Sequence, residues 1–217
     1  MMESKENEIE LRKVLNTLKL RKKIIGIGGA GCNIVQRATD FDMQGVELVA
    51  IDVDSKHLDI VPIENKYLIC KDPRGGFIFS SVEGDKEERN TIYDNMEKTD
   101  ITFLVCGLGG STGTAAAPMV AEIAREHCAL IFAICVLPFK VEGAKSGRRA
   151  EKALTELEGI ADTVVSIKND RLLETYPGLD MVDAFGTLDD LIVRFIKAVI
   201  DPISSDDDCK KALSKLG

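Results

Sequence analysis

Six short apolar runs that alternate with amphipathic segments constrain the fold of this chain more than any other feature. The runs are rich in Ile, Val, Leu and Cys, and most of them lack alternation between apolar and polar residues. Strands of this kind are covered on both faces, which is typical of a parallel sheet between two layers of helices. The predicted strands lie at 23–28, 46–52, 67–70, 101–107, 129–136 and 163–167.

Amphipathic periodicity places helices between and after these strands, and a further helix before the first of them, in the segment 1–22. Strands that alternate with helices favour a doubly wound α/β fold, with a mainly parallel sheet and helices on both faces. The other predicted helices lie at 30–39, 85–97, 114–127, 147–159 and 181–200, with a turn from 201 and a short last helix at 209–216.

Composition and charge narrow the class of protein. The 217 residues are 45% hydrophobic and 29% charged, which is typical of a globular chain. The formal charge of −8 disfavours non-specific binding to nucleic acid, and no apolar run reaches the roughly 18–20 residues of a membrane helix. The six cysteines contain no Cys-x-x-Cys pair, so we interpret them as reduced core residues and not as a disulfide framework or zinc site. We expect a cytoplasmic protein without nucleic-acid partners or direct membrane insertion.

Two glycine-rich loops follow the first and fourth predicted strands, at 26–33 and 107–114. Glycine lets backbone N–H groups approach an anion, and the N-terminus of the following helix adds a partial positive charge. Ligands of doubly wound sheets bind beyond the carboxyl ends of the strands, where both loops are expected. Two such loops suit a ligand that carries several phosphates.

Other nucleotide and enzyme patterns compete with this interpretation. Residues 26–31 match G-x-G-x-x-G with Asp52 about twenty residues on, as in NAD-binding Rossmann enzymes, but that fold does not need the second loop. Residues 109–113 match the G-x-S-x-G nucleophile elbow, yet the only later histidine, His127, ends the very next helix and cannot reach back. The P-loop pattern G-x-x-x-x-G-K-[ST] is absent from the sequence.

The second loop, Gly-Gly-Ser-Thr-Gly-Thr, resembles the signature loop of the tubulin/FtsZ family of GTPases. Further segments resemble family motifs in the same order, and the resemblance spans about residues 23–200. It implies a Rossmann-like GTPase domain that binds GTP or GDP, with Mg²⁺ expected beside a triphosphate. The other matching segments are 26–33, 50–54, 137–143, 166–173 and 183–190.

The resemblance also implies roles for individual side chains. Phe185 would stack on the guanine face, Asp189 would accept from guanine N1–H and N2–H, and Asn169 would complete the recognition. Glu142 would accept hydrogen bonds from the ribose hydroxyls. No metal ligand is predicted. The positions expected to bind the nucleotide are Gly28, Gly29, Ala30, Asn33, Asp52, Gly109, Gly110, Ser111, Thr112, Gly113, Thr114, Pro138, Glu142, Asn169, Phe185 and Asp189.

Several positions depart from the family pattern. Ser111 stands where the signature loop has glycine, and the third-loop region at 74–84 lacks the family turn. The family has a basic residue at the position of Ser146, and Lys145 or Arg148 is close enough in sequence to take its place. The family's catalytic loop is shortened to 201–208, in which Asp208 is the candidate catalytic acid acting on a neighbouring subunit. The alternative is that the acidic residues 206–208 cap the last helix.

These features predict three regions. They are an N-terminal helical extension at 1–22, a nucleotide-binding domain at 23–180, and a central helix with a shortened catalytic loop and terminal helix at 181–217, without the family's second domain. The leading hypothesis is a guanine-nucleotide-binding protein of cell division or cytoskeletal assembly. Its GTP hydrolysis would be weak or depend on self-association or on an FtsZ-type filament subunit. The alternative is a non-hydrolysing protein that caps or regulates such a filament, and an NAD-binding Rossmann enzyme ranks third.

Overall fold

The computed structural model describes residues 20–71, 77–81, 99–175, 178 and 180–204. Its centre is a seven-stranded sheet in the order β4-β3-β2-β1-β5-β6-β7. Six of these strands run parallel, and β4 pairs antiparallel with β3 at one edge. The strands are β1 Lys22–Ile27, β2 Val46–Asp52, β3 Asn65–Lys71, β4 Phe77–Ser81, β5 Thr99–Gly107, β6 Cys128–Leu137 and β7 Thr163–Lys168.

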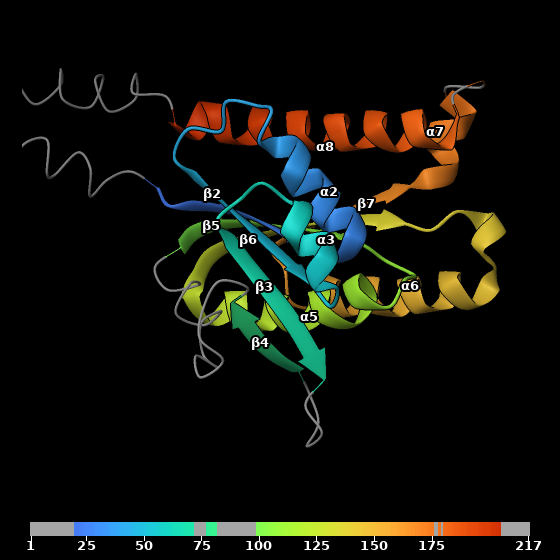
Figure 1. The fold of residues 1–217 in the computed structure, drawn as a ribbon, viewed down its shortest axis with the longest axis horizontal. Coiled ribbons are helices and arrows are strands. Elements are labelled where there is room, and N and C mark those ends of the chain that lie inside the picture. Colours follow the sequence, from blue (N-terminus) through green and yellow to red (C-terminus); the bar gives the residue numbers. More distant parts are fainter. Residues whose placement is uncertain (1–19, 72–76, 82–98, 176–177, 179, 205–217) are drawn as a thin grey trace, which may run out of the picture.

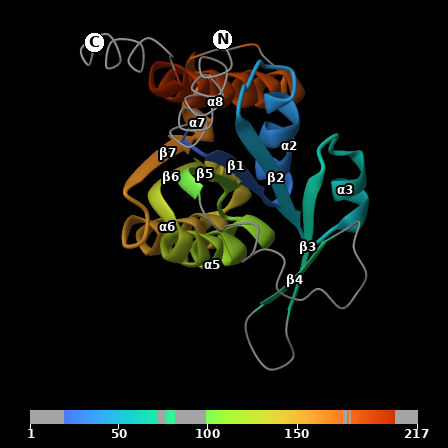
Figure 2. The same ribbon diagram turned by 90° about the vertical axis from the view of Figure 1, so that its left-hand side faces the viewer.

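Helices cover both faces of this sheet, as Figures 1 and 2 show, so the predicted doubly wound α/β fold is confirmed. The predicted helices at 1–22, 85–97 and 209–216 lie wholly or largely outside the described residues. The described helices are α2 Gly28–Ala38, α3 Ser55–Ile60, α5 Thr112–His127, α6 Ala144–Glu158, α7 Asn169–Thr175 and α8 Met181–Ser204, with a 3-10 turn η1 at Lys140–Glu142.

The central strands send alternate residues into separate cores on the two faces of the sheet. In β1, Ile24 joins the core beneath α2 and α8, whereas Ile25 joins the core beneath α5 and α6. Both faces of the strands must therefore be apolar, which explains why the strand sequences lack alternation. On α8 the buried residues recur at helical spacing, which gives this helix one apolar face. They are Ala184, Leu188, Ile192, Val193, Ile196 and Ile200.

The structure also corrects parts of the sequence interpretation. Strand β4 and the six-residue helix α3 were not predicted. Helix α3 is shorter than the window in which helical periodicity is visible, and β4 lies in the segment 74–84 that was interpreted as a loop. Asp54 caps α3 by accepting a hydrogen bond from the Lys56 backbone N–H. The turn predicted from Asp201 is wrong, since α8 continues to Ser204, and the Lys197–Asp201 ion pair spans its last turns. Among the described residues, no helix is long and apolar enough to cross a membrane.

The sheet has its topological switch point at β1. The chain passes from β1 to β2 on one side and later returns to β5 on the other. Ligands of doubly wound proteins bind at such a point, beyond the carboxyl ends of the strands. Strands β1 and β5 are paired in register up to Ile27 and Cys106, so the two glycine-rich loops emerge side by side.

Candidate functional site

A cavity of about 300 Å³ lies at the carboxyl ends of β1 and β5. It is bounded by both glycine-rich loops, by the segment that follows β6, and by the starts of α7 and α8. Its lining residues are Ile27, Gly28, Gly29, Ala30, Ile34, Gly107, Leu108, Gly110, Ser111, Thr112, Gly113, Val136, Pro138, Glu142, Asn169, Phe185, Leu188 and Asp189. The fold therefore brings twelve of the sixteen predicted binding positions together around one cavity.

Close backbone contact joins the two glycine-rich loops at one end of the cavity. Gly28 has φ +71°, and a Cβ atom there would lie 3.0 Å from the backbone nitrogen of Gly113. Helices α2 and α5 begin at these loops, so their unpaired N–H groups and positive dipole ends face the same space. This end of the cavity suits a ligand with negative charge.

Gly109 holds the second loop in shape. It has φ +98°, its N–H donates to Thr114 Oγ1 at 2.8 Å, and its carbonyl accepts from the Arg149 guanidinium. A Cβ atom at Gly109 would lie 2.4 Å from the Ser146 hydroxyl oxygen. Gly109 and Thr114 thus shape the loop from outside the cavity. Ser111 has φ −83°, so the side chain that replaces the family's glycine is accommodated without backbone strain.

The opposite end of the cavity presents acceptor groups beside an aromatic ring. Asn169, the first residue of α7, is only 5% exposed, and its buried Oδ1 has no hydrogen-bond partner. Phe185 is 41% exposed and meets Phe139 edge to face, with ring centroids 5.8 Å apart. Burial raises the pKa of Asp189 to about 7, partly offset by the positive charge of Arg37. An unpaired buried acceptor is costly, so this end suits a planar ligand that carries N–H donors.

Glu142 adds a carboxylate to the cavity lining. Its Oε1 accepts the backbone N–H of Phe139 at 2.8 Å, which fixes the turn η1 after Pro138. Pro138 and Glu142 both line the cavity. A carboxylate in the lining can accept further hydrogen bonds from a hydroxylated part of a ligand.

Asn33 and Asp52 lie outside this lining. Asp52 Oδ2 is 2.8 Å from His57 Nδ1, and Asn33 Oδ1 is 3.3 Å from His57 Nε2. Their side chains therefore contact His57 of α3, a helix that the sequence did not predict. The other predicted residues outside the lining are Gly109 and Thr114, and Asp208 lies outside the described residues, as do positions 74–76.

Sequence reasoning missed Arg149, the basic residue that contacts the second glycine loop. Lys145 and Arg148 were the predicted substitutes for a basic side chain at position 146. Helix α6, however, buries Ser146 against Gly109, so position 149, three residues later on the same face, is the one directed at the loop. The helical spacing from Ser146 was the signal that could have identified it.

Comparisons with known proteins agree with this geometry. A model of the Tubulin/FtsZ family, GTPase domain, matches residues 21–177. Cell division protein FtsZ 1 of Archaeoglobus fulgidus is 40% identical over 202 residues, which cover 91% of this chain and 55% of that protein. The FtsZ 1 of Pyrococcus furiosus is 38% identical over 200 residues, which cover 90% of this chain and 54% of that protein. The chain spans about half the length of the curated relatives it matches.

Solved structures show the same fold. An empty FtsZ dimer of M. jannaschii superposes with a TM-score of 0.76 at 32% identity, over 92% of this chain and 60% of that one. A protofilament of CetZ2 from Haloferax volcanii bound to GTPγS gives a TM-score of 0.67 at 24% identity, over 83% of this chain and 58% of that one. The second likeness concerns the fold alone.

Proposed function

Because this chain belongs to the Tubulin/FtsZ family and carries its GTPase domain, we propose that the cavity binds a guanine nucleotide. The observation that carries the proposal is the buried Asn169 Oδ1, which lines the cavity without a hydrogen-bond partner. Asp189 lines the same cavity, so its lining contains two acceptor side chains. Guanine offers N1–H and N2–H donors on one edge, and adenine has an acceptor at N1 instead. The acceptor pair therefore favours guanine.

The remaining residues fit the rest of the nucleotide. The N–H groups at the starts of α2 and α5 would hold the phosphates, Glu142 would hold the ribose, and Phe185 would stack on the base. Mg²⁺ prefers oxygen ligands and would accompany a triphosphate, chiefly through its phosphate oxygens. An NAD-binding function is disfavoured, because NAD binding would give no role to the second glycine-rich loop or to the two acceptor side chains, Asn169 and Asp189.

The identity of the nucleotide carried by the purified protein tests this proposal. We expect heat denaturation of the freshly purified full chain to release GDP or GTP, resolved by chromatography against adenine nucleotide and NAD standards. A released guanine nucleotide supports the assignment, and GTP in excess over GDP indicates slow hydrolysis. Release of NAD, or a nucleotide-free protein that also fails to bind added GTP, would overturn it.

We propose that hydrolysis of GTP to GDP and phosphate depends on association with a second subunit. Asp208 is the candidate residue for positioning the attacking water in the neighbouring site, which follows the family resemblance. Positioned groups of this kind contribute orders of magnitude to phosphoryl transfer, so an isolated subunit would turn over slowly. We propose cell division or cytoskeletal assembly as the process, consistent with the cell-division relatives.

Turnover per subunit is expected to rise with protein concentration, because dilution separates the two halves of the catalytic site. Phosphate release measured over a wide dilution series, at saturating GTP, checks this. Asp208→Ala should retain GTP affinity and lose the concentration-dependent part of the rate. A rate per subunit that is constant on dilution contradicts the proposed dependence, and a stable, unhydrolysed GTP complex would favour a role in binding filaments without turnover.

A further inference from the structure

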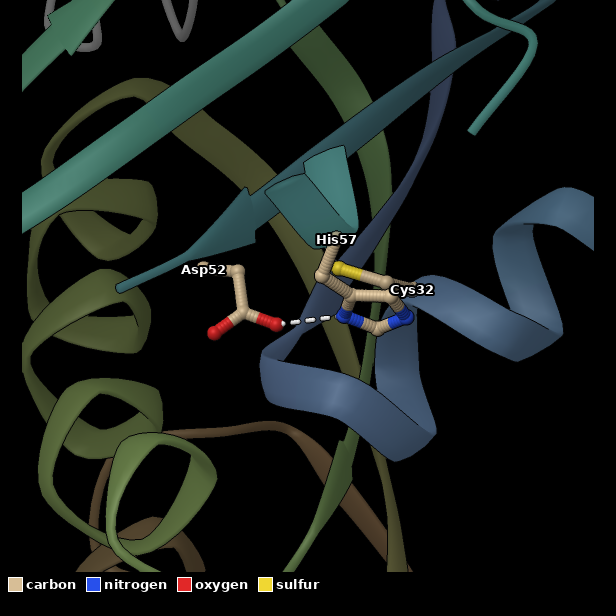
Figure 3. Close-up of side chains that lie close together, drawn as sticks. All are labelled: Cys32, Asp52 and His57. Atoms are coloured by element: carbon tan, nitrogen blue, oxygen red, sulfur yellow. Dashed lines mark hydrogen bonds and ion pairs between the residues drawn. The ribbon is translucent and has the colours of Figure 1, made fainter. Parts of the chain in front are cut away.

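Cys32, Asp52 and His57 form a cluster of potential metal ligands outside the cavity. They come from three elements, namely α2, the end of β2, and α3, as Figure 3 shows. The Cys32 sulfur, a carboxylate oxygen of Asp52 and a ring nitrogen of His57 all lie within 4.8 Å of one another. No linear spacing motif links positions 32, 52 and 57, and only the fold brings them together.

The donor set selects the type of metal. Thiolate, imidazole and carboxylate together suit zinc, whereas Mg²⁺ and Ca²⁺ prefer oxygen alone. Bond lengths of about 2.0–2.3 Å to a tetrahedral zinc place neighbouring donor atoms roughly 3.3–3.8 Å apart, so the observed cluster needs only small side-chain adjustments. We propose that Cys32, Asp52 and His57 form a three-ligand site for zinc or a similar divalent transition metal, with the fourth position taken by water.

The hydrogen-bond partners of His57 support this assignment. Nδ1 lies 2.8 Å from Asp52 Oδ2, and Nε2 lies 3.3 Å from Asn33 Oδ1, so an acceptor oxygen faces each ring nitrogen. A neutral imidazole carries one N–H and can donate to only one of them. A metal bound at Nδ1 leaves the proton on Nε2, which then donates to Asn33. Metal-bound histidines commonly hold their second ring N–H in this way.

Cys32 is buried, and its sulfur lies close to the Asp52 carboxylate. A thiolate in this place would be repelled by the carboxylate. A divalent cation between the two groups removes the repulsion between thiolate and carboxylate. On binding, the zinc–sulfur bond forms, and the thiol proton is released to solvent.

The site is open to metal ions on the His57 side and borders the first glycine loop. The His57 side chain is 22% exposed, whereas Cys32 and Asp52 are buried. A Cβ atom added to Gly29 would lie 3.7 Å from His57 Cε1, and Gly29 itself lines the cavity. None of the three ligands lines the cavity, so this metal site is separate from the proposed nucleotide site and does not depend on it.

Cobalt chloride is the probe for the test. The full chain, freed of metal with a chelator, is titrated with Co²⁺ and then with Zn²⁺. We expect a thiolate-to-cobalt charge-transfer band in the near ultraviolet and the intense visible absorption of four-coordinate Co²⁺, both abolished by stoichiometric Zn²⁺. Cys32→Ser should lose the charge-transfer band. Cys70→Ser removes an exposed cysteine and is the matched control, which should retain the band.

A histidine pair provides a second measurement in case Cys32→Ser does not fold. His57→Gln should weaken zinc binding, measured by competition with a chromophoric chelator, by more than the roughly 10–100-fold that loss of an outer hydrogen-bond partner costs. His127→Gln, the only other histidine, should bind zinc unchanged. No cobalt band in the unaltered protein, a band that persists in Cys32→Ser or disappears in Cys70→Ser, or unchanged zinc affinity in His57→Gln would overturn the proposal.

Discussion

Asp189→Asn is expected to weaken GDP and GTP binding by about 1–3 kcal/mol, or between roughly 5- and 150-fold. The Asp189 carboxylate would accept hydrogen bonds from both N–H groups on the guanine edge. An asparagine amide has one acceptor oxygen, so its NH₂ group would face one of the guanine N–H donors without forming a hydrogen bond. Isothermal titration of nucleotide-free protein measures the loss. The same variant should gain affinity for xanthine nucleotides, because xanthine carries an acceptor oxygen in place of the guanine amino group.

The neighbouring residue provides the control for this experiment. Asp190 follows Asp189 on α8, but it is paired with the Arg37 guanidinium and does not line the cavity. Above pH 7, where Asp189 is ionised in both proteins, Asp190→Asn should therefore leave nucleotide affinity unchanged and cost at most about 1 kcal/mol of stability, as expected for an exposed ion pair. Equal GDP affinity in Asp189→Asn and the unaltered protein would mean that the base lies elsewhere.

Guanine-nucleotide affinity is expected to fall by up to about tenfold per pH unit below pH 7. In the free protein, burial raises the pKa of Asp189 to about 7. Two N–H donors from guanine would stabilise the ionised form, so the pKa in the complex is lower than in the free protein. Binding then requires the ionised form of Asp189. The affinity for guanine nucleotide is therefore constant above pH 7, and it falls below pH 7 as the Asp189 carboxyl takes up a proton.

Titrations in buffers of different ionisation enthalpy detect the proton released on binding near pH 7. The terminal phosphate of the nucleotide also titrates in this region, with a pKa of about 6. Asp189→Asn retains that contribution and removes the carboxyl, so the difference between the two pH profiles isolates Asp189. Asp190 does not confuse the comparison, because Arg37 lowers its pKa. Parallel profiles for the two proteins would contradict the assignment.

Much of the fold was predictable because burial on two faces leaves a strong sequence signal. The apolar runs around Ile24 and Phe103 marked central strands, and the spacing of Leu188, Ile192 and Ile196 marked α8. Strand β4 and helix α3 were not predictable in this way. Helix α3 has six residues, too few for helical periodicity to show, and β4 lies in the segment 74–84 that was interpreted as a loop.

Site residues were predictable where the backbone conformation requires glycine. They were missed where their role depends on how helices and loops pack together. Glycine at positions 28 and 109 is required by positive φ angles, and the sequence pattern shows it directly. Contacts such as Arg149 with Gly109, or His57 with Asp52, depend on the rotation of a helix about its axis and on the presence of α3. No pattern in a single segment contains that information.

The close approach of the loop backbones restricts how this sequence can vary. A Cβ atom at Gly113 would lie 2.3 Å from the carbonyl oxygen of Gly107, and one at Gly31 would lie 2.4 Å from that of Val105. The obstructing atoms belong to the main chain, so no exchange of a neighbouring side chain can make room for a larger residue. A second substitution elsewhere therefore cannot compensate for replacement of Gly31 or Gly113. At Gly110 an added Cβ atom would meet no protein atom within 4 Å, so the protein's own packing does not require glycine there, and only a ligand in the cavity that Gly110 lines would exclude a side chain.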